Sequence, residues 1–330
     1  MNKPIDIVRR RLHLAALAGV LMLAAGAAGA QTWPDKPIRL VVPAPAGSGL
    51  DQVSRVLSER LTPMLGQQVI VDNKPGAAGI IGGADVLKSS RDGSTFMVMI
   101  NGFASEIPHV VKMPFDPLVS FRPTVELARY GLVLAINPQV PANDVAGFIA
   151  YAKANKGKVN FASYSAGTVS HTLGLELNKI AGLDMVHVPY KGSPPALQDL
   201  MGGQVQAMFD ASSNVQPFAK AGKLKVLATT APQRLPTFPD VPTFAELGYK
   251  DLTEVAWAGL WSASDVPAPI QQKMREATLK ALQDPKVRET FATMGWTQGS
   301  GATTEEMVAS LRTASDRQAA MLKAIGFKPE

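Results

Sequence analysis

Residues 38–65, IRLVVPAPAGSGLDQVSRVLSERLTPML, decide the fold because they predict a strand, a tight loop and a helix in succession. The opening run, 38–42, is almost entirely aliphatic, which is typical of a strand buried on both faces of a parallel sheet. Proline and glycine then end the strand, and apolar residues return at helical spacing behind Asp51, where an N-cap or first-turn acid belongs. The stretch therefore predicts an α/β fold.

The loop of this element consists of small residues that let a ligand approach the main chain. The helix behind it begins with N–H groups that have no partner within the helix and carry a partial positive charge. We therefore expect Ala46, Gly47 and Ser48 to bind an anion, although such a loop often serves only as a connection. A nucleotide fingerprint is absent, because Gln52 stands at the third glycine position of G-x-G-x-x-G and no P-loop motif occurs.

The same arrangement recurs further along the chain. Residues 159–180 predict a strand, a second loop of small residues at 163–168 and a helix. A third loop, 101–105, follows a predicted strand at 95–100. Loops at the carboxyl ends of parallel strands form the usual ligand crevice of α/β sheets, so we expect the loop after 38–42, the small-residue loop at 73–79 and the loop at 101–105 to converge at one edge of the first sheet.

Other apolar runs predict further strands, at 68–72, 132–136, 186–190, 204–209, 226–230 and 257–263. Helices are expected at 143–154 and from Ala268, Pro285 and Thr303 onward. The last of these begins with the capping box Thr303-x-x-Glu306.

The N-terminus predicts a secretory signal peptide over residues 1–30. Three arginines at 9–11 precede an apolar stretch at 12–25, and Ala28-Gly29-Ala30 forms an A-x-A cleavage site. The apolar stretch is shorter than the roughly 20 residues that a membrane span needs. We expect export to the periplasm, by the general secretory or the twin-arginine route, and a mature chain that begins at Gln31.

Composition limits the remaining classes. The 330-residue chain has no cysteine, which excludes disulfides and thiolate metal sites. Its formal net charge of +6 includes +3 from the leader, so the mature chain is too weakly basic to predict nucleic-acid binding.

Five motifs, which follow one another over almost the whole mature chain, carry a resemblance to a known family. They are WPDKPIRLVVPAPAGSGLD (33–51), LGQQVIVDNKPGAAGIIGG (65–83), HVPYKGSPPALQDLMGGQV (187–205), AGKLKVLATTAPQRLPTFPDVPTFAELG (221–248) and WAGLWSA (257–263). In the sequence and order of these five motifs, the chain resembles the Bug receptors, the extracytoplasmic solute-binding proteins of tripartite tricarboxylate transporters.

The resemblance implies a type II periplasmic-binding-protein fold, with two α/β domains joined by crossing strands and a small carboxylate held in the cleft between them. Domain 1 would comprise residues 31–131 and 254–330, and domain 2 residues 132–253. The resemblance implies no cofactor, no metal and no catalytic residue. We expect a monomer that delivers its ligand to a tripartite tricarboxylate-type membrane transporter or to a sensor kinase.

The family's two binding loops align with residues 43–48 and 163–168 of this sequence. The resemblance implies that the two loops face each other and hold a carboxylate through main-chain amides and hydroxyls, with Ser48 and Thr168 as side-chain donors. The predicted ligand-binding residues are Ala46, Gly47, Ser48, Asp51, Phe103, Tyr164, Ser165, Ala166, Gly167, Thr168 and Asp210.

Three of the singled-out side chains also have structural interpretations. Asp51 is suited to ordering its own loop, since it would repel an anionic ligand. Phe103 is suited to core packing, and Asp210 either meets a ligand amine or hydroxyl or belongs to a turn. His171, one turn into its helix, is more typical of a hydrogen-bonded structural histidine than of a ligand contact.

The sequence departs from the family pattern at Ala44, Ala46, Tyr164 and Ser165. Two bulky groups of the first loop are replaced by alanine, which predicts a wider cleft lined by Tyr164 and Phe103. On this basis we expect a carboxylate with an apolar or aromatic body in preference to citrate-like or amino-acid ligands.

A secreted α/β hydrolase is the competing interpretation. Residues 163–167, SYSAG, resemble the G-x-S-x-G nucleophile elbow with Ser165 as the nucleophile. Only His171 and His187 follow Ser165, and both come early in the remaining chain, so the order typical of a hydrolase triad is not met.

Overall fold

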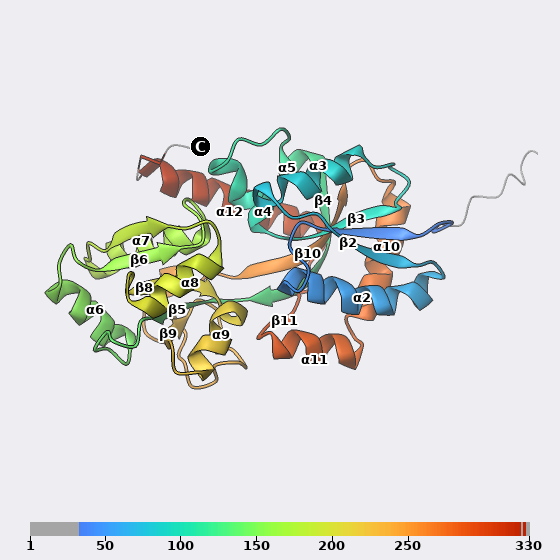
Figure 1. Cartoon of the computed structure of the whole chain (residues 1–330). Coiled ribbons are helices and arrows are strands. Elements are labelled where there is room, and N and C mark those ends of the chain that lie inside the picture. Colours follow the sequence, from blue (N-terminus) through green and yellow to red (C-terminus); the bar gives the residue numbers. More distant parts are fainter. Residues whose placement is uncertain (1–32, 325, 328–330) are drawn as a thin grey trace, which may run out of the picture.

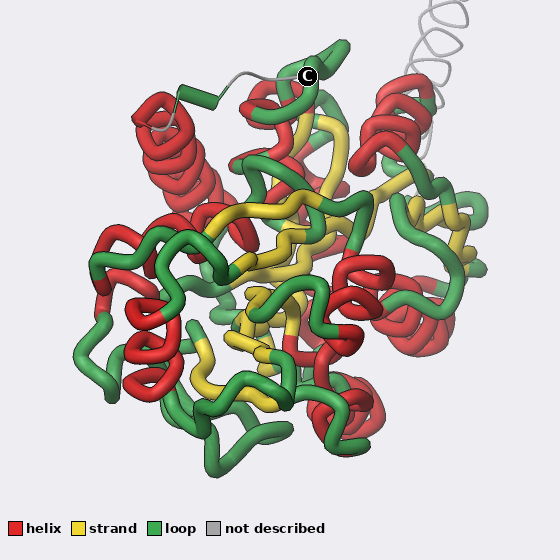
Figure 2. The backbone as a smooth tube through the Cα atoms, turned by 60° about the vertical axis from the view of Figure 1, so that its left-hand side comes forward, coloured by secondary structure: helices red, strands yellow, loops and turns green. Residues whose placement is uncertain are grey.

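The computed structural model describes residues 33–324, 326 and 327, and the predicted leader lies outside the described residues. This part of the chain forms a six-stranded and a five-stranded sheet, which lie side by side (Figure 1). We call the part built on the six-stranded sheet the first lobe and the part built on the five-stranded sheet the second lobe. Figure 2 shows the strands of both lobes in the interior and most helices toward the outside.

The sheet of the first lobe has the strand order β11-β4-β10-β3-β1-β2. β1 pairs in parallel with β2 and β3, whereas β10 runs antiparallel to both β3 and β4. The strands are β1 (Ile38–Val42), β2 (Val69–Asn73), β3 (Thr95–Ile100), β4 (Phe121–Tyr130), β10 (Ala256–Ala263) and β11 (Thr297–Gln298). The predicted strand at 38–42 is confirmed.

The sheet of the second lobe has the order β7-β6-β8-β5-β9. β6 pairs in parallel with β7 and β8, and β5 lies antiparallel between β8 and β9. The strands are β5 (Leu132–Ile136), β6 (Asn160–Ser163), β7 (Val186–Pro189), β8 (Ala207–Ala211) and β9 (Lys225–Thr229).

Helices cover both faces of each sheet. In the first lobe the helices are α2 (Gly49–Leu65), α3 (Ile80–Lys88), α4 (Gly102–Ser105), α5 (Pro117–Ser120), α10 (Ala268–Ala281), α11 (Pro285–Thr293) and α12 (Thr304–Ala324). In the second lobe they are α6 (Val145–Ala154), α7 (Val169–Ala181), α8 (Ser193–Gly202) and α9 (Ser212–Lys220). Short 3-10 turns lie at η1 (Ala77–Gly79), η2 (Ile107–His109) and η3 (Lys250–Leu252).

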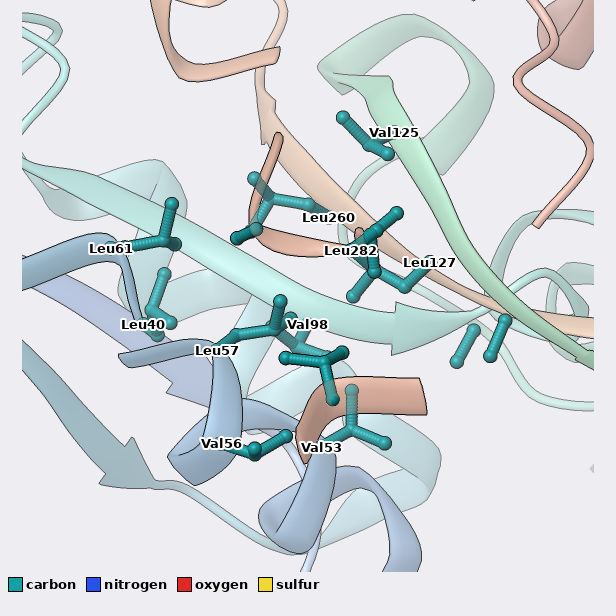
Figure 3. Close-up of a cluster of buried hydrophobic side chains, with 14 of the residues drawn as sticks. Leu40, Val53, Val56, Leu57, Leu61, Val98, Val125, Leu127, Leu260 and Leu282 are labelled. Carbon is teal, nitrogen blue, oxygen red and sulfur yellow. The ribbon is translucent and has the colours of Figure 1, made fainter. Parts of the chain in front are cut away.

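The alternation of side chains along β1 explains the two cores of the first lobe. Leu40 points to the face where Val53 and Leu57 of α2 pack with Leu260 (Figure 3). Its neighbour Val41 points to the opposite face and joins a second buried cluster. Both faces of the strand are therefore buried, which is why the run is aliphatic throughout.

Strand β4 does not follow from the apolar pattern, because Arg122, Pro123 and Glu126 interrupt it. Pro123 lies opposite Trp261, next to a register shift in the pairing with β10. A bulge accommodates a residue that has no N–H to donate, so the strand continues past the proline.

The chain passes from the first lobe to the second at Gly131, between β4 and β5. A Cβ added at Gly131 would lie 2.7 Å from Cβ and 2.9 Å from the backbone nitrogen of Ala231. Only glycine fits this contact without a movement of the main chain. The chain returns near Glu254, whose N–H donates to the carbonyl of Thr230 at 3.0 Å, and then enters β10.

Helix α12 forms a third link between the lobes. It begins with the predicted capping box, in which Thr303 N–H donates to Glu306 at 2.7 Å and Glu306 N–H donates to the Thr303 hydroxyl at 3.2 Å. Its last turns lie beside α7, where Met321 and Leu175 line a common pocket (Figure 1).

Within the described residues, no helix has both the length and the apolar character required to cross a membrane.

The crossing at Gly131 yields a stability prediction. Gly131→Ala should lower the free energy of unfolding by about 1 to 3 kcal/mol, because the new methyl group overlaps main-chain atoms of Ala231. Gly202→Ala is the matched control, since nothing lies within 4 Å of the Cβ position at the end of α8. Equal urea midpoints for the two variants would contradict the close packing at the crossing.

Candidate functional site

A cavity of about 170 Å³ lies where the two lobes meet. Asn101, Glu106 and Tyr130 line it from the first lobe. Tyr164, Val169, Ser193, Asp210 and Asn214 line it from the second lobe. Tyr130 and Asp210 lie among the last residues of β4 and β8, whereas Asn101 and Tyr164 directly follow β3 and β6, so strand ends from both sheets are directed at the same space.

Three helices of the second lobe begin at the cavity. Val169 and Ser193 are the first residues of α7 and α8, and Ala211 precedes α9. The N–H groups in the first turn of a helix have no partner within the helix and carry a partial positive charge, although Pro194 and Pro195 remove two of these groups from α8. The cavity therefore has the backbone geometry of an anion site.

The loop before α7, residues 163–168, is held by its own side chains. The hydroxyl groups of Ser163 and Thr168 donate to the carbonyl oxygen of Ser165 at 2.9 and 2.7 Å. Gly167 N–H donates to Nδ1 of His171 at 3.0 Å. The hydroxyl of Thr168, which the sequence predicts as a ligand donor, is thus committed to the loop itself.

Two histidines form hydrogen bonds with this loop. The rings of His171 and His187 stack with centroids 3.6 Å apart, and Nε2 of His187 lies 2.7 Å from the hydroxyl of Ser163. Burial lowers the pKa of His171 to about 4. Burial, together with the neighbouring His171, lowers the pKa of His187 to about 3. Both rings are neutral at pH 7, and His171 is the structural histidine that its position indicates.

The side chain of Glu106 reaches from the first lobe to the start of α7 in the second lobe. Its carboxylate accepts a hydrogen bond from the N–H of Val169 at 2.9 Å. Burial, with a smaller effect of the charge of Glu254, raises the pKa of the Glu106 carboxyl to about 7, although the hydrogen bond from Val169 acts in the opposite direction. A protein carboxylate thus already occupies one of the amides at the start of α7.

Asp210 joins the starts of α8 and α9. Its Oδ1 accepts hydrogen bonds from the hydroxyl of Ser193 at 3.0 Å, from Ala211 N–H at 2.7 Å and from the amide of Asn214 at 3.1 Å. The residue is 1% exposed. Burial raises the pKa of Asp210 to about 6, although these hydrogen bonds act in the opposite direction.

Two tyrosines contribute to the apolar part of the cavity wall. The ring of Tyr130 stacks on Trp296 with centroids 4.9 Å apart. Burial raises the pKa of both Tyr130 and Tyr164 above the usual tyrosine value, so both side chains remain neutral hydroxyls at pH 7.

The predicted first loop is built as a helix start but does not line this cavity. Ser48 is the N-cap of α2, and its hydroxyl accepts the N–H of Asp51 at 3.3 Å. The buried carboxylate of Asp51 accepts Gly47 N–H at 2.8 Å and is also bonded to Arg55 and Asn73. Burial opposes ionisation of Asp51, but these hydrogen bonds outweigh it and keep its pKa low. Asp51 therefore orders its own loop.

Two residues expected to shape the cleft lie elsewhere. Phe103 is fully buried against Phe115 and Phe121 in the core of the first lobe. Ala44 packs against the core beneath α2. The structure therefore places neither Ala44 nor Phe103 on the wall of this cavity.

Of the predicted ligand-binding residues, the structure brings Tyr164 and Asp210 to the cavity wall. Ser165, Ala166, Gly167 and Thr168 form the loop directly before α7, whereas Ala46, Gly47 and Ser48 lie in the first-lobe loop before α2. Whether these loops contact the ligand stays a prediction.

Sequence reasoning missed several residues of the cavity wall, namely Asn101, Glu106, Tyr130, Ser193 and Asn214. Glu106 directly follows the third loop, and Ser193 begins a helix after a glycine, so their positions gave a weak signal. Their convergence depends on the way the two lobes pack.

The geometry gives no support to the hydrolase. The hydroxyl of Ser165 points to the carbonyl of Ala166 at 3.4 Å, and the two nearby histidines bond to Gly167 and Ser163 instead. Within residues 33–324, 326 and 327, no cluster of three or more His, Cys, Asp or Glu side chains is placed to hold a metal ion.

The depressed pKa of His171 predicts a pH-dependent stability term. The native pKa of about 4 lies below the usual value of 6.5, so the unfolded chain takes up the proton first as the pH falls. The contribution of this ring is complete above pH 6.5 and is lost toward pH 4. From pH 7 to pH 5 the loss should be about 1 to 2 kcal/mol.

The comparison with His171→Asn isolates this term, because the Asn oxygen can accept Gly167 N–H and does not titrate. Contributions of Glu106 and Asp210 cancel in the difference, which then reports His171 together with its effect on the pKa of His187. The stability advantage of the wild type over the variant, measured by urea denaturation, should shrink between pH 7 and pH 5. An advantage that stays constant over this range would contradict a buried neutral His171.

Comparisons with known proteins agree with this geometry. Residues 53–327 match the family described as tripartite tricarboxylate transporter family receptor. A UPF0065 protein of Bordetella bronchiseptica is 32% identical over 339 residues, a match that covers 100% of both chains.

Two solved structures show the same two-lobed fold. The periplasmic binding protein BugD is 32% identical, with a TM-score of 0.76 over 90% of this chain and 100% of that one. The R. palustris protein Rpa4515, solved with adipate, is 27% identical, with a TM-score of 0.80 over 90% of this chain and 100% of that one. The fold expected from the resemblance is thereby confirmed, and the chain belongs to the receptor family of the tripartite tricarboxylate transporters.

Proposed function

We propose that this protein is a periplasmic solute receptor that captures a small carboxylate in the cleft between its lobes and delivers it to a tripartite tricarboxylate-type transporter. The observation that carries the proposal is the cavity at the junction of the lobes, where three helices begin. Helix starts stabilise a carboxylate without a cationic side chain. The related Rpa4515 was solved with a dicarboxylate, adipate.

The main-chain amides of the second loop are the proposed carboxylate donors. Ser165, Ala166 and Thr168 donate no backbone hydrogen bond to any residue in the described part of the chain. Their N–H groups lie next to Val169, whose own N–H is taken by Glu106. A ligand carboxylate at this position would complete the hydrogen bonding of the loop.

The proposed domain organisation follows the two crossings. Residues 31–131 and 254–330 would form domain 1, and residues 132–253 would form domain 2, with Gly131 at one crossing. Movement about these crossings would bring Ala46, Gly47 and Ser48 of the first loop toward the ligand. We further propose that residues 1–30 direct export, that the receptor is a monomer and that it has no enzymatic activity.

A thermal-shift screen of the purified mature chain tests the function. Mono-, di-, tri- and aromatic carboxylates are compared with their neutral amides at equal concentration. A bound acid at a hundred times its dissociation constant should add about 2.7 kcal/mol to the free energy of unfolding.

The neutral amides serve as the control for carboxylate recognition, since they keep the carbon skeleton and lose the charge. If no acid raises the melting temperature, or if amides stabilise the protein as much as the acids do, the carboxylate receptor is contradicted.

A further inference from the structure

The side chain of Asp210 has one oxygen that the fold does not use. Its Oδ1 accepts three hydrogen bonds, whereas its Oδ2 has no hydrogen-bond partner among the described residues. The residue is 1% exposed and lines the cavity between the lobes. A buried carboxylate oxygen without a donor is costly, and such groups are normally paired with a donor or a cation.

The charge around the cavity is also one-sided. Glu106 and Asp210 are its two ionisable acids, and no Lys, Arg or His side chain lines it within the described part of the chain. A ligand that is only an anion would place a further negative charge beside Asp210, whose pKa of about 6 leaves it mostly ionised at pH 7, and beside the partly ionised Glu106. Helix starts offset part of this repulsion, but Glu106 and Asp210 already occupy the N–H groups of Val169 and Ala211.

We propose that the ligand is an amino carboxylate, whose protonated amine binds Oδ2 of Asp210 while its carboxylate binds the free amides before α7. This inference rests on the proposed function and narrows its substrate class. The amine supplies both the donor that Oδ2 lacks and the positive charge that the cavity lacks. The ligand as a whole is then neutral, so two protein carboxylates in the wall do not exclude it.

The acid–base properties of the two carboxyl groups agree with this assignment. Burial raises the pKa of Asp210 to about 6 and that of Glu106 to about 7, as expected for carboxylates without a nearby cation. An ammonium group within hydrogen-bond distance would favour the ionised form of Asp210. Charge-assisted hydrogen bonds of this kind are about twice as strong as neutral ones.

A hydroxyl or an apolar group meets these conditions less well. A hydroxyl would satisfy Oδ2 but would leave the excess negative charge in place. An apolar or aromatic body, which the departures at Ala44 and Ala46 predict from the sequence, would leave Oδ2 unpaired. The structure also places Ala44 and Phe103 away from the cavity, so the departure at Ala44 does not shape its wall.

Matched acids on one carbon skeleton provide the test. Isothermal titration calorimetry with the mature chain compares hexanoate, 6-aminohexanoate, 2-aminohexanoate and adipate, and then butyrate, 4-aminobutyrate, 2-aminobutyrate and succinate. In at least one set, an amino acid should bind about 10- to 100-fold more tightly than the unsubstituted acid and the diacid.

Substitution of Asp210 tests the assigned partner of the amine. In Asp210→Asn the side-chain oxygen can keep the three bonds of Oδ1, and an NH₂ group replaces Oδ2. The preferred amino acid should then bind about 10- to 100-fold more weakly, while the unsubstituted acid keeps or gains affinity. Asp199→Asn is the matched control, because Asp199 bonds to Tyr190 at 2.7 Å and does not line the cavity.

The outcomes separate the inference from the function on which it rests. If in both sets the unsubstituted acid or the diacid binds at least as tightly as every amino acid, the amino carboxylate is wrong and the carboxylate receptor stands. If none of these acids nor any acid of the wider screen binds, the proposed function fails as well. Because the wild-type comparison decides by itself, the test does not depend on correct folding of Asp210→Asn.

Discussion

The hydrogen bond from Val169 N–H to the carboxylate of Glu106 is the contact on which the site depends. It joins the start of a second-lobe helix to a residue that follows β3 of the first lobe, across the space between the sheets. Helix starts that face this space need acceptors for their free N–H groups. The protein meets this need with its own acids, Glu106 at α7 and Asp210 beside α9. Away from the cavity, Asp51 in the first turn of α2 accepts Gly47 N–H in the same way.

This use of internal acids sets what the cleft can accept. An anion site built from helix starts is unselective, because main-chain amides bind almost any carboxylate. Some of those amides already donate to a protein carboxylate, so only part of the loop at 163–168 is left for a ligand. The same carboxylates raise the local negative charge. Selectivity then comes from charge balance as well as from shape, which distinguishes this cleft from a simple carboxylate pocket.

Much of the fold follows from the sequence, because buried strands and small-residue loops leave a local pattern. The run at 38–42 and the capping box of Thr303 and Glu306 are confirmed. Strand β4 does not follow from the same reasoning, since Pro123 and charged residues hide it and only a bulge opposite Trp261 accommodates the proline. The formation of β4 is determined by its pairing with β10, which lies far from β4 in the sequence.

The site is less predictable than the fold. The loop before α7 and Asp210 could be identified, because the loop follows β6 and Asp210 is the penultimate residue of β8, and both strands end at the cleft. Glu106 could not, since its partner Val169 is 63 residues away in the other lobe. Phe103 follows a strand in the same way and yet lies in the core, so position after a strand does not by itself determine which way a side chain points.

Amide hydrogen exchange over residues 164–169, with and without the tightest-binding acid of the carboxylate screen, tests the central claim most directly. When the acid saturates the protein, exchange at Ser165, Ala166 and Thr168 should become slower, because the carboxylate of the acid accepts hydrogen bonds from their free N–H groups. Exchange in α10, on the far side of the first lobe, should not change. Unchanged exchange throughout 164–169 in the saturated protein would show that the carboxylate binds elsewhere and would contradict the account.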